Sequence, residues 1–261
     1  MSRQSTVLAA LGSRLIALIV LSMACVGLAQ HSNEELDAAA VFERYIDATG
    51  GRSAWSHIVN RVVHSTMSMP AHDLEIEMTV TTARPNLRRS VLLSEMTGRI
   101  EKGSDGQIVW QTDPSGHSEI KTGDARDNYL RESVVNKYLD WRKSFKQIAL
   151  EGSGQVDGVA AWIVRAEPPR GPTQRLFFAK KSGLLIQLAV SSLSPSGELS
   201  AKAIFSDYRD AGGVLMPFQV TITLPGSERL VTVQSVETNI TLPEGFFAPP
   251  PELRAQPVRG N

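Results

Sequence analysis

Residues 74–80 read Leu-Glu-Ile-Glu-Met-Thr-Val, and apolar and polar side chains alternate through this stretch without interruption. Strict alternation predicts a β-strand with one buried face, because successive side chains of a strand point to opposite sides. The same period of two recurs in residues 63–69 and 218–224, and turn sequences such as Asp157-Gly158 and Pro225-Gly226 separate the alternating segments. The pattern predicts a mainly β chain (class α+β), with roughly ten antiparallel strands in a barrel or curved meander.

A first helix is predicted ahead of the strands. Residues 32–35, Ser-Asn-Glu-Glu, form a capping box, in which the serine hydroxyl and the last carboxylate satisfy each other's free backbone N–H groups. Apolar residues then recur at helical spacing from Leu36 to Ile46. Gly50-Gly51 ends this helix, because glycine adopts the left-handed conformation without steric penalty, and Trp55 returns the chain to the core.

A second helix is predicted over residues 125–147, where apolar side chains form one stripe and basic side chains occupy the opposite face. The stripe consists of Leu130, Val134, Tyr138, Trp141 and Phe145. In one interpretation the stripe packs on the sheet and the charges are solvated. In the other, the helix is a movable lid over an apolar cavity, and its basic face also suits peripheral contact with anionic lipid heads at a membrane.

Residues 1–29 have the pattern of an export signal. Arg3 and Arg14 are the only charges, an apolar stretch covers residues 15–21, and small residues lead to Ala29. A basic start, a short apolar core and a small-residue exit are typical of a secretory signal peptide. The apolar stretch is shorter than the ~20 residues that span a bilayer, which disfavours the alternative of a retained anchor. We therefore expect an exported protein of the periplasm or cell envelope.

Cys25 is the only cysteine and lies within this signal. Cleavage after Ala29 would leave a mature chain with neither a disulfide nor a reactive thiol. The tetrapeptide Ser22-Met23-Ala24-Cys25 is also an imperfect lipobox, with serine where bacterial lipoproteins carry leucine. Lipidation of Cys25, with anchoring to the membrane, is thus the alternative to soluble release.

Charge and length fix the organisation of the remaining chain. The sequence has 27 Lys and Arg against 27 Asp and Glu, and loss of the two signal arginines leaves the mature chain slightly acidic. Such a balance offers no electrostatic footprint for nucleic acid. Residues 30–248 are expected to form one domain with a hydrophobic core. Residues 249–261 are Pro-rich and are expected to be disordered, since they cannot pair in a sheet.

No catalytic, metal or cofactor motif is present. The five histidines are scattered, without the spacing that places two on one helix face. Glu75 and Glu77 share a strand face, as glycosidase carboxylates can, but exposed acids on a solvated strand show the same pattern. We therefore predict no catalytic residue, no metal and no cofactor, and a binding protein in place of an enzyme.

Four segments in order along the chain resemble a known family: residues 48–55, the hairpin 103–110, the strand-turn-strand 176–185, and residues 205–218. Their order is similar to that of the bacterial outer-membrane lipoprotein-sorting proteins, the LolA/LolB-like superfamily, in a divergent branch. The resemblance implies a half-open antiparallel β-barrel whose mouth is covered by helices. It also implies an apolar concave face that holds the acyl chains of a lipid or lipoprotein.

Apolar residues on the predicted inward strand faces are the candidates to line this cavity. They are Met67, Met69, Ile76, Met78, Trp110, Trp162, Phe178, Met216 and Phe218. Methionine suits an adaptable lining, because its unbranched thioether side chain repacks around different shapes. The alternative is that these side chains fill the interior as ordinary core. In the sorting carrier an arginine on an early strand holds the lid closed; Arg84, Arg88 and Arg89 lie in the comparable region here, and the sequence assigns that role to none of them.

The function predicted from these features is binding or shuttling of a lipid or lipoprotein acyl group, without catalysis. One alternative is an envelope scaffold or sensor that binds a protein partner through an exposed apolar patch. A second alternative is a cofactor-independent enzyme acting on an apolar small molecule, which requires polar groups that converge inside the concavity.

Overall fold

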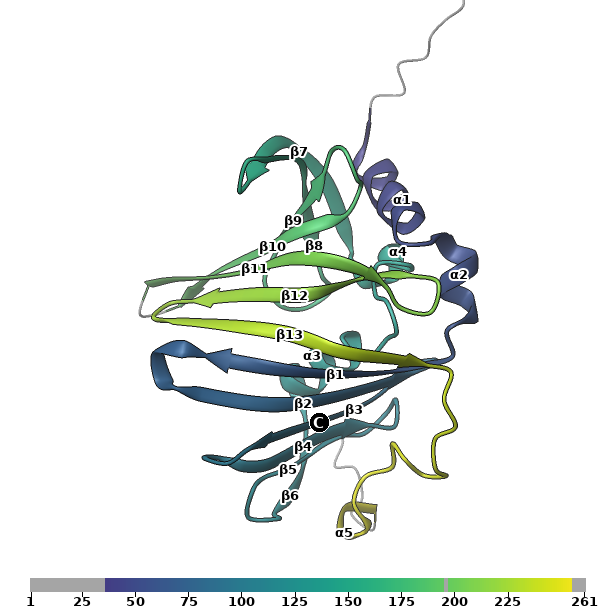
Figure 1. The fold of residues 1–261 in the computed structure, drawn as a ribbon, viewed down its shortest axis with the longest axis vertical. Coiled ribbons are helices and arrows are strands. Elements are labelled where there is room, and N and C mark those ends of the chain that lie inside the picture. Colours follow the sequence, from purple (N-terminus) through teal and green to yellow (C-terminus); the bar gives the residue numbers. More distant parts are fainter. Residues whose placement is uncertain (1–35, 195–196, 255–261) are drawn as a thin grey trace, which may run out of the picture. The chain divides into compact units, whose positions relative to one another are not determined.

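The computed structural model describes residues 36–194 and 197–254. The predicted signal with Cys25, the Ser32–Glu35 capping box and residues 255–261 lie outside the described residues. Within the described part, thirteen strands form one antiparallel sheet (Figure 1). The strands are β1 (Asn60–Met69), β2 (Leu74–Ala83), β3 (Leu87–Ser94), β4 (Gly98–Ser104), β5 (Val109–Thr112), β6 (Ser118–Lys121), β7 (Gln147–Val156), β8 (Val159–Glu167), β9 (Gln174–Ala179), β10 (Leu185–Ser194), β11 (Gly197–Asp210), β12 (Leu215–Leu224) and β13 (Ser227–Thr238).

The order of the strands determines how the sheet is covered. The chain enters in the middle at β1, meanders outward to the edge strand β6, crosses to the opposite edge strand β7, and meanders back until β13 pairs with β1. The two edges are not joined, so the sheet is an open barrel with covering helices, as predicted. Residues 122–146 make the crossing from β6 to β7, and we call them the crossover segment. They contain α3 (Gly123–Arg131) and α4 (Trp141–Ser144).

The first predicted helix is confirmed, but it begins later than the capping box suggests. It is α1 (Ala38–Ala48), and its N-cap is Asp37, whose Oδ1 accepts a hydrogen bond from the Ala40 N–H at 2.7 Å. Gly50 follows the helix with φ of 114°, in the left-handed region, and precedes α2 (Gly51–His57). As predicted, Trp55 returns to the core, and its Nε1 donates to the Thr49 hydroxyl at 3.1 Å.

Aromatic side chains form the centre of the main core, between α1 and strands β8 to β10. The Phe42 ring stacks on Trp141 at 5.5 Å between centroids and meets Phe178 edge-on at 5.4 Å. Tyr45 meets Tyr138 and Phe178 edge-on, at 5.6 Å each. Offset and edge-to-face contacts of this kind stabilise beyond the area they bury. We call the sheet face that carries Phe178 the inner face. The helices α1, α2 and α4 lie together near one end of the strands (Figure 1).

The prediction of a single helix over residues 125–147 is wrong, because the helical structure of the crossover segment is interrupted between α3 and α4. The Ser133 hydroxyl donates back to the Tyr129 carbonyl at 2.6 Å, and the Asn136 side chain accepts from the Tyr138 N–H at 3.0 Å. Such local bonds compete with the helical backbone bonds. The end of the apolar stripe is nevertheless used, since Tyr138, Trp141 and Phe145 are buried in the main core.

Residues 251–254 also differ from the prediction of disorder, which covered residues 249–261. Pro251–Arg254 form the short helix α5, and Leu253 is 2% exposed. The neighbouring Phe246 carbonyl accepts a hydrogen bond from Arg89 Nη1 at 3.0 Å. Because Arg89 pairs with Gly103 and Gly103 with Trp110, all three lie on the face opposite the inner face. The C-terminal segment therefore packs on that outer face.

Candidate functional site

An apolar surface crosses the inner face of the sheet. Cross-strand pairing places five apolar residues side by side on five adjacent strands, and most of them are only half-buried. They are Ile76, Met67, Val231, Val220 and Phe205, on β2, β1, β13, β12 and β11. Phe205 also packs against the main core, which identifies the face. A second row, Met78, Leu92 and Ile100, extends the surface onto β3 and β4.

The inner face is polar at its other end, near α2. Arg61 on β1 pairs with Thr82 on β2, and Thr82 pairs with Arg88 on β3, so the three side chains form a row. Arg61 and Met67 are six residues apart on one strand, and the alternation of side chains puts both on the inner face. A pocket of about 270 Å³ lies here between the sheet and the crossover segment, and Tyr45, Arg61, Arg88, Asn136, Tyr138 and Met216 are among its walls.

The Arg61 guanidinium has an unusual set of contacts. Its Nη1 donates to the Met216 sulfur at 3.1 Å, and its buried Nε has no hydrogen-bond partner among the described residues. Burial, together with the nearby Arg88 charge, lowers the pKa of Arg61 to about 10. The group therefore remains a cation at neutral pH. A thioether is a weak acceptor, so within the described residues the Arg61 guanidinium has no strong hydrogen-bond acceptor.

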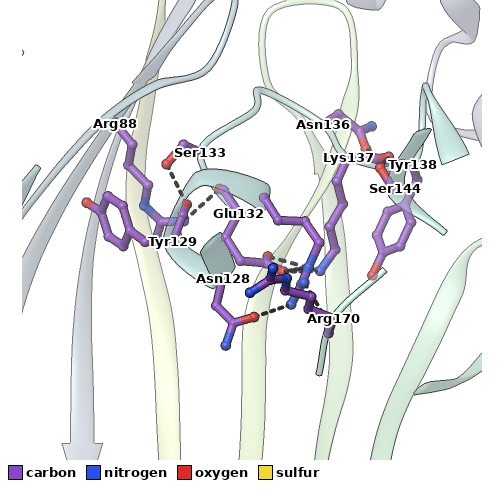
Figure 2. Close-up of polar contacts among 11 residues, drawn as sticks. Arg88, Asn128, Tyr129, Glu132, Ser133, Asn136, Lys137, Tyr138, Ser144 and Arg170 are labelled. Atoms are coloured by element: carbon purple, nitrogen blue, oxygen red, sulfur yellow. Dashed lines mark hydrogen bonds and ion pairs between the residues drawn. The ribbon is translucent and has the colours of Figure 1, made fainter. Parts of the chain in front are cut away.

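Arg88 holds the crossover segment against the sheet. Its Nη1 donates to the Glu132 carbonyl at 2.8 Å, directly after α3, as Figure 2 shows. The Glu132 carboxylate turns to Lys137, with an Oε1–Nζ distance of 2.8 Å. Of the three arginines that the sequence singled out, Arg84 instead donates to the Ile58 carbonyl at 2.9 Å, and Arg89 lies on the outer face. Among these three arginines, Arg88 is thus the one that donates a hydrogen bond to the crossover segment.

A larger pocket of about 510 Å³ shares part of the crossover segment. Its apolar wall comes from Val134, Val135 and Leu139, with prolines at positions 85 and 169. The charged residues around it are Arg84, Asp127, Arg131, Lys137, Asp140, Lys143 and Arg170. Several of these already pair with one another, as Lys143 does with Asp140 at 2.6 Å and Arg170 with Asp127 at 3.2 Å. The pocket is an apolar depression with a mainly basic rim.

The residues predicted to line a cavity divide into groups. Met67, Ile76 and Met78 belong to the apolar surface of the inner face. Met69 is the last residue of β1 and is half-buried, and Met216 is part of the wall of the pocket around Arg61, which we call the polar pocket.

The aromatic residues among the predicted lining are mostly occupied elsewhere. Phe178 is 1% exposed under α1, and Trp162 packs at the edge of the same core with Lys180 Nζ 3.7 Å from its ring centroid. Phe218 is buried, and the Arg209 guanidinium lies 4.9 Å from its ring centroid. The prediction that Trp110 lines the inner cavity is wrong, because its pairing with Gly103 places it on the outer face.

Sequence reasoning missed Arg61, Thr82 and Asn136. A signal for Arg61 was available, because it continues the alternation of Val63, Ser65 and Met67 that marked the inward side of this strand. An arginine in phase with buried apolar residues is unusual, since arginine is rarely buried without a partner.

Metal-binding and membrane-spanning features were also searched in the described residues. These residues contain no group of three or more His, Cys, Asp or Glu side chains that could hold a metal ion. None of the described helices has both the length and the apolar composition needed to cross a bilayer.

Comparison with solved structures identifies the fold. No family model matches the sequence, and no curated protein does. A DUF1329 family protein from Desulfovibrio piger matches with a TM-score of 0.59 at 12% identity, over 80% of this chain and 96% of that one. A LolA superfamily protein from Nitrosomonas europaea matches with 0.56 at 12% identity, over 82% and 98%. A putative outer membrane lipoprotein-sorting protein domain from Vibrio parahaemolyticus matches with 0.54 at 9% identity, over 72% and 89%. The chain has the LolA-like fold.

Proposed function

We propose that this protein is an exported envelope protein that binds or carries a lipid, or the acyl group of a lipoprotein, on the inner face of its sheet without catalysis. The observation that carries the proposal is the row of half-buried apolar residues across five strands, from Ile76 to Phe205. Contiguous apolar surface left open to solvent is typical of a binding site. The export signal predicted at residues 1–29 supports the same conclusion.

The crossover segment supports a ligand that enters and leaves. Its helix α3 contains no buried residue, and residues 132–140 have no regular secondary structure. The part around α3 is held by polar side-chain contacts, among them the bonds from Arg88 to the Glu132 carbonyl and from Arg131 to the Arg170 carbonyl. Segments with few buried apolar contacts open at low free-energy cost. Displacement of this segment would expose more of the polar pocket and of the inner face.

Adjacent leucines on β3 provide the test. Leu92 belongs to the inner apolar surface, and Leu93, 46% exposed, points to the other face. We expect native mass spectrometry of the mature protein from an envelope fraction to show a bound acyl species, which Leu92→Lys abolishes and Leu93→Lys retains. A charge in an apolar site is costly, whereas at an exposed site it is not. Equal loss in both variants, or an unliganded protein even after incubation with lipids, would contradict the proposal.

A protein partner is the second candidate, and the 510 Å³ pocket favours it. An apolar wall with a mainly basic rim suits an acidic segment with an apolar anchor. A pull-down from envelope extract with wild-type protein and with Val134→Glu tests this candidate. If the wild-type protein purifies without lipid and captures a partner that Val134→Glu does not capture, the result would favour the protein-partner function over the carrier function.

The enzyme alternative is weaker at this site. Arg61 and Asn136 line one pocket and Thr82 pairs with Arg61, but a general base needs a pKa near the working pH. Arg61, with a pKa of about 10, stays protonated there. The carboxylate of Glu132 is engaged by Lys137. These groups are suited to recognition.

A further inference from the structure

Three buried polar groups without partners gather at the polar end of the inner face. In the described ranges, six buried side-chain nitrogen or oxygen atoms have no hydrogen-bond partner, and half of them belong to Arg61, Thr82 and Asn136. Arg61 and Thr82 are direct neighbours on β1 and β2, and Asn136 lies across the same pocket from Arg61. Buried polar groups are nearly always satisfied in native proteins, so a cluster of unsatisfied ones indicates a missing partner.

The missing partner carries negative charge. Neither Arg61 nor Arg88 forms an ion pair with any residue that the structure describes, and the nearby Arg88 charge contributes to the lowered pKa of Arg61. Arg88 donates to the neutral Glu132 carbonyl and the Ser90 hydroxyl, and its guanidinium carbon lies 5.4 Å from the centroid of the Tyr129 ring. Arg61 donates to the Met216 sulfur. A buried cation without a counter-charge is strongly unfavourable. An anion bound between the two guanidinium groups would remove this cost.

The donors available match an oxyanion. The Arg61 Nε–H and the Asn136 Nδ2–H are donors only, and the Asn136 amide orientation is fixed because its Oδ1 accepts from the Tyr138 N–H. The Thr82 hydroxyl rotates and can donate as well. A carboxylate accepts up to about four hydrogen bonds and fits the edge of a guanidinium in bidentate fashion.

The position of the anion determines the rest of the ligand. Arg61 lies on the same face of β1 as Met67, about 20 Å away at the usual rise of an extended strand. The charged end therefore continues into the apolar surface that runs across β2, β1 and β13. The pocket around Arg61 measures about 270 Å³ and takes a compact head group.

We propose that the ligand is an amphiphile with a single carboxylate, a long-chain fatty acid, whose carboxylate binds Arg61 with support from Thr82, Asn136 and Arg88. Its acyl chain lies along Met67, Ile76 and their neighbours. The inference rests on the proposed acyl-binding function and adds the class of head group. It also distinguishes this site from a purely apolar acyl cavity, in which a fatty acid and the corresponding alcohol would bind equally.

The test compares two probes with the same chain, hexadecanoic acid and hexadecan-1-ol, binding to the delipidated mature protein in calorimetry. We expect the acid to bind at least about tenfold tighter than the alcohol, because hydrogen bonds to a charged group contribute more free energy than hydrogen bonds to a neutral one. Arg61→Met should reduce this ratio to about one while the alcohol affinity is unchanged. Arg99→Met, an exposed arginine that pairs with Glu101 on the outer face, is the matched control and should keep the ratio.

The outcomes separate this inference from the proposed function. Equal affinities of the wild-type protein for acid and alcohol would overturn the carboxylate site and leave acyl binding intact. Binding of neither probe would overturn both. Inorganic phosphate that binds as tightly as hexadecanoic acid would identify a site for free oxyanions and also overturn the inference. If thermal unfolding shows that Arg61→Met does not fold, Asn136→Ala serves as the second variant. It removes one donor from the crossover segment and is expected to lower the ratio of acid affinity to alcohol affinity several-fold.

Discussion

The indole Nε1 of Trp141 donates a hydrogen bond to Glu43 Oε1 at 3.1 Å, and this bond ties the end of the crossover segment to α1. Glu43 also accepts from Arg52, whose Nη2 lies 2.8 Å from Oε2, and Arg52 Nη1 in turn donates to the Leu139 carbonyl at 2.7 Å. One carboxylate thus connects α1, α2 and the crossover segment. With the Arg88 bond at the other end, these polar contacts add to the burial of Tyr138, Trp141 and Phe145 in the main core.

Replacement of Glu43 by glutamine should weaken this attachment. Although partial burial opposes the effect, hydrogen bonds from Arg52 and Trp141 lower the pKa of Glu43 below its usual range. A lowered pKa in the folded state means that the carboxylate stabilises the protein above its ordinary pKa, and that this contribution is lost as the pH falls. We expect Glu43→Gln to reduce stability at neutral pH by about 1 kcal/mol, because the pair is partly exposed.

Chemical denaturation at two pH values measures this effect. At pH 7 the variant should unfold at lower denaturant concentration than the wild-type protein, and below pH 4 the two curves should approach each other. Glu75→Gln, on the exposed side of β2, serves as the control and should unfold like the wild type at both values. If Glu43→Gln is less stable than the wild type by the same amount in acid as at pH 7, the charge of the Glu43 carboxylate does not contribute to stability.

Neighbouring arginines on β3 should control two different segments. Arg88→Met removes the bond to the Glu132 carbonyl, and Arg89→Met removes the bond to the Phe246 carbonyl on the other face. Each lost bond is worth about 1–2 kcal/mol of local stability. Hydrogen exchange should therefore accelerate in residues 130–137 for the first variant and in residues 244–254 for the second. Acceleration of the same segment in both variants would refute separate roles for the two arginines.

The alternation of side chains made the sheet predictable, because in a strand the period of the sequence directly encodes which face each residue occupies. Ile76 and Met78 were assigned correctly to the inner side for this reason. The same rule cannot say which face is covered by which segment. Trp110 was predicted to be an inward residue, yet it lies on the outer face, where the Arg89 guanidinium also meets the Phe246 ring.

The crossover segment shows why local periodicity failed where it did. Leu130, Val134 and Tyr138 have helical spacing, but the Ser133 and Asn136 side chains bond to nearby backbone groups and end the helix. The polar pocket could not be predicted from the sequence for a related reason. Its walls come from α1, α2, β1, β3, β12 and the crossover segment, and only the tertiary fold brings these elements together.

Gly103 should tolerate no side chain. A Cβ atom at this position would overlap the Trp110 ring, which lies directly across the strand pair and is 2% exposed. Overpacking of a filled core costs about 1–3 kcal/mol. We expect Gly103→Ala to lower stability by that amount in denaturant unfolding. Gly154→Ala is the control, since a Cβ there meets only the flexible end of Ile163, and its stability should remain near that of the wild type.

Buried tyrosines should make the protein sensitive to alkaline pH. Burial, with a smaller contribution from the Glu132 charge, raises the pKa of Tyr138 well above its ordinary value of 10.0. Burial likewise raises the pKa of Tyr45 and of Tyr208. Above pH 10 the unfolded chain releases these protons and the folded protein keeps them. Stability therefore falls with rising pH, by about 1.4 kcal/mol per pH unit for each such group.

Tyr138→Phe isolates one of these groups. Phenylalanine retains the ring contacts with Phe42 and Tyr45 and removes the titrating hydroxyl. We expect the variant to match the wild type near pH 7 and to exceed it in free energy of unfolding at pH 11, where its stability declines less steeply. The lowered pKa of Arg61 acts in the opposite direction in both proteins and cancels in the comparison. Stability curves that stay parallel from pH 9 to pH 11 would mean that Tyr138 ionises as readily in the folded protein as in the unfolded chain, and that its site admits water.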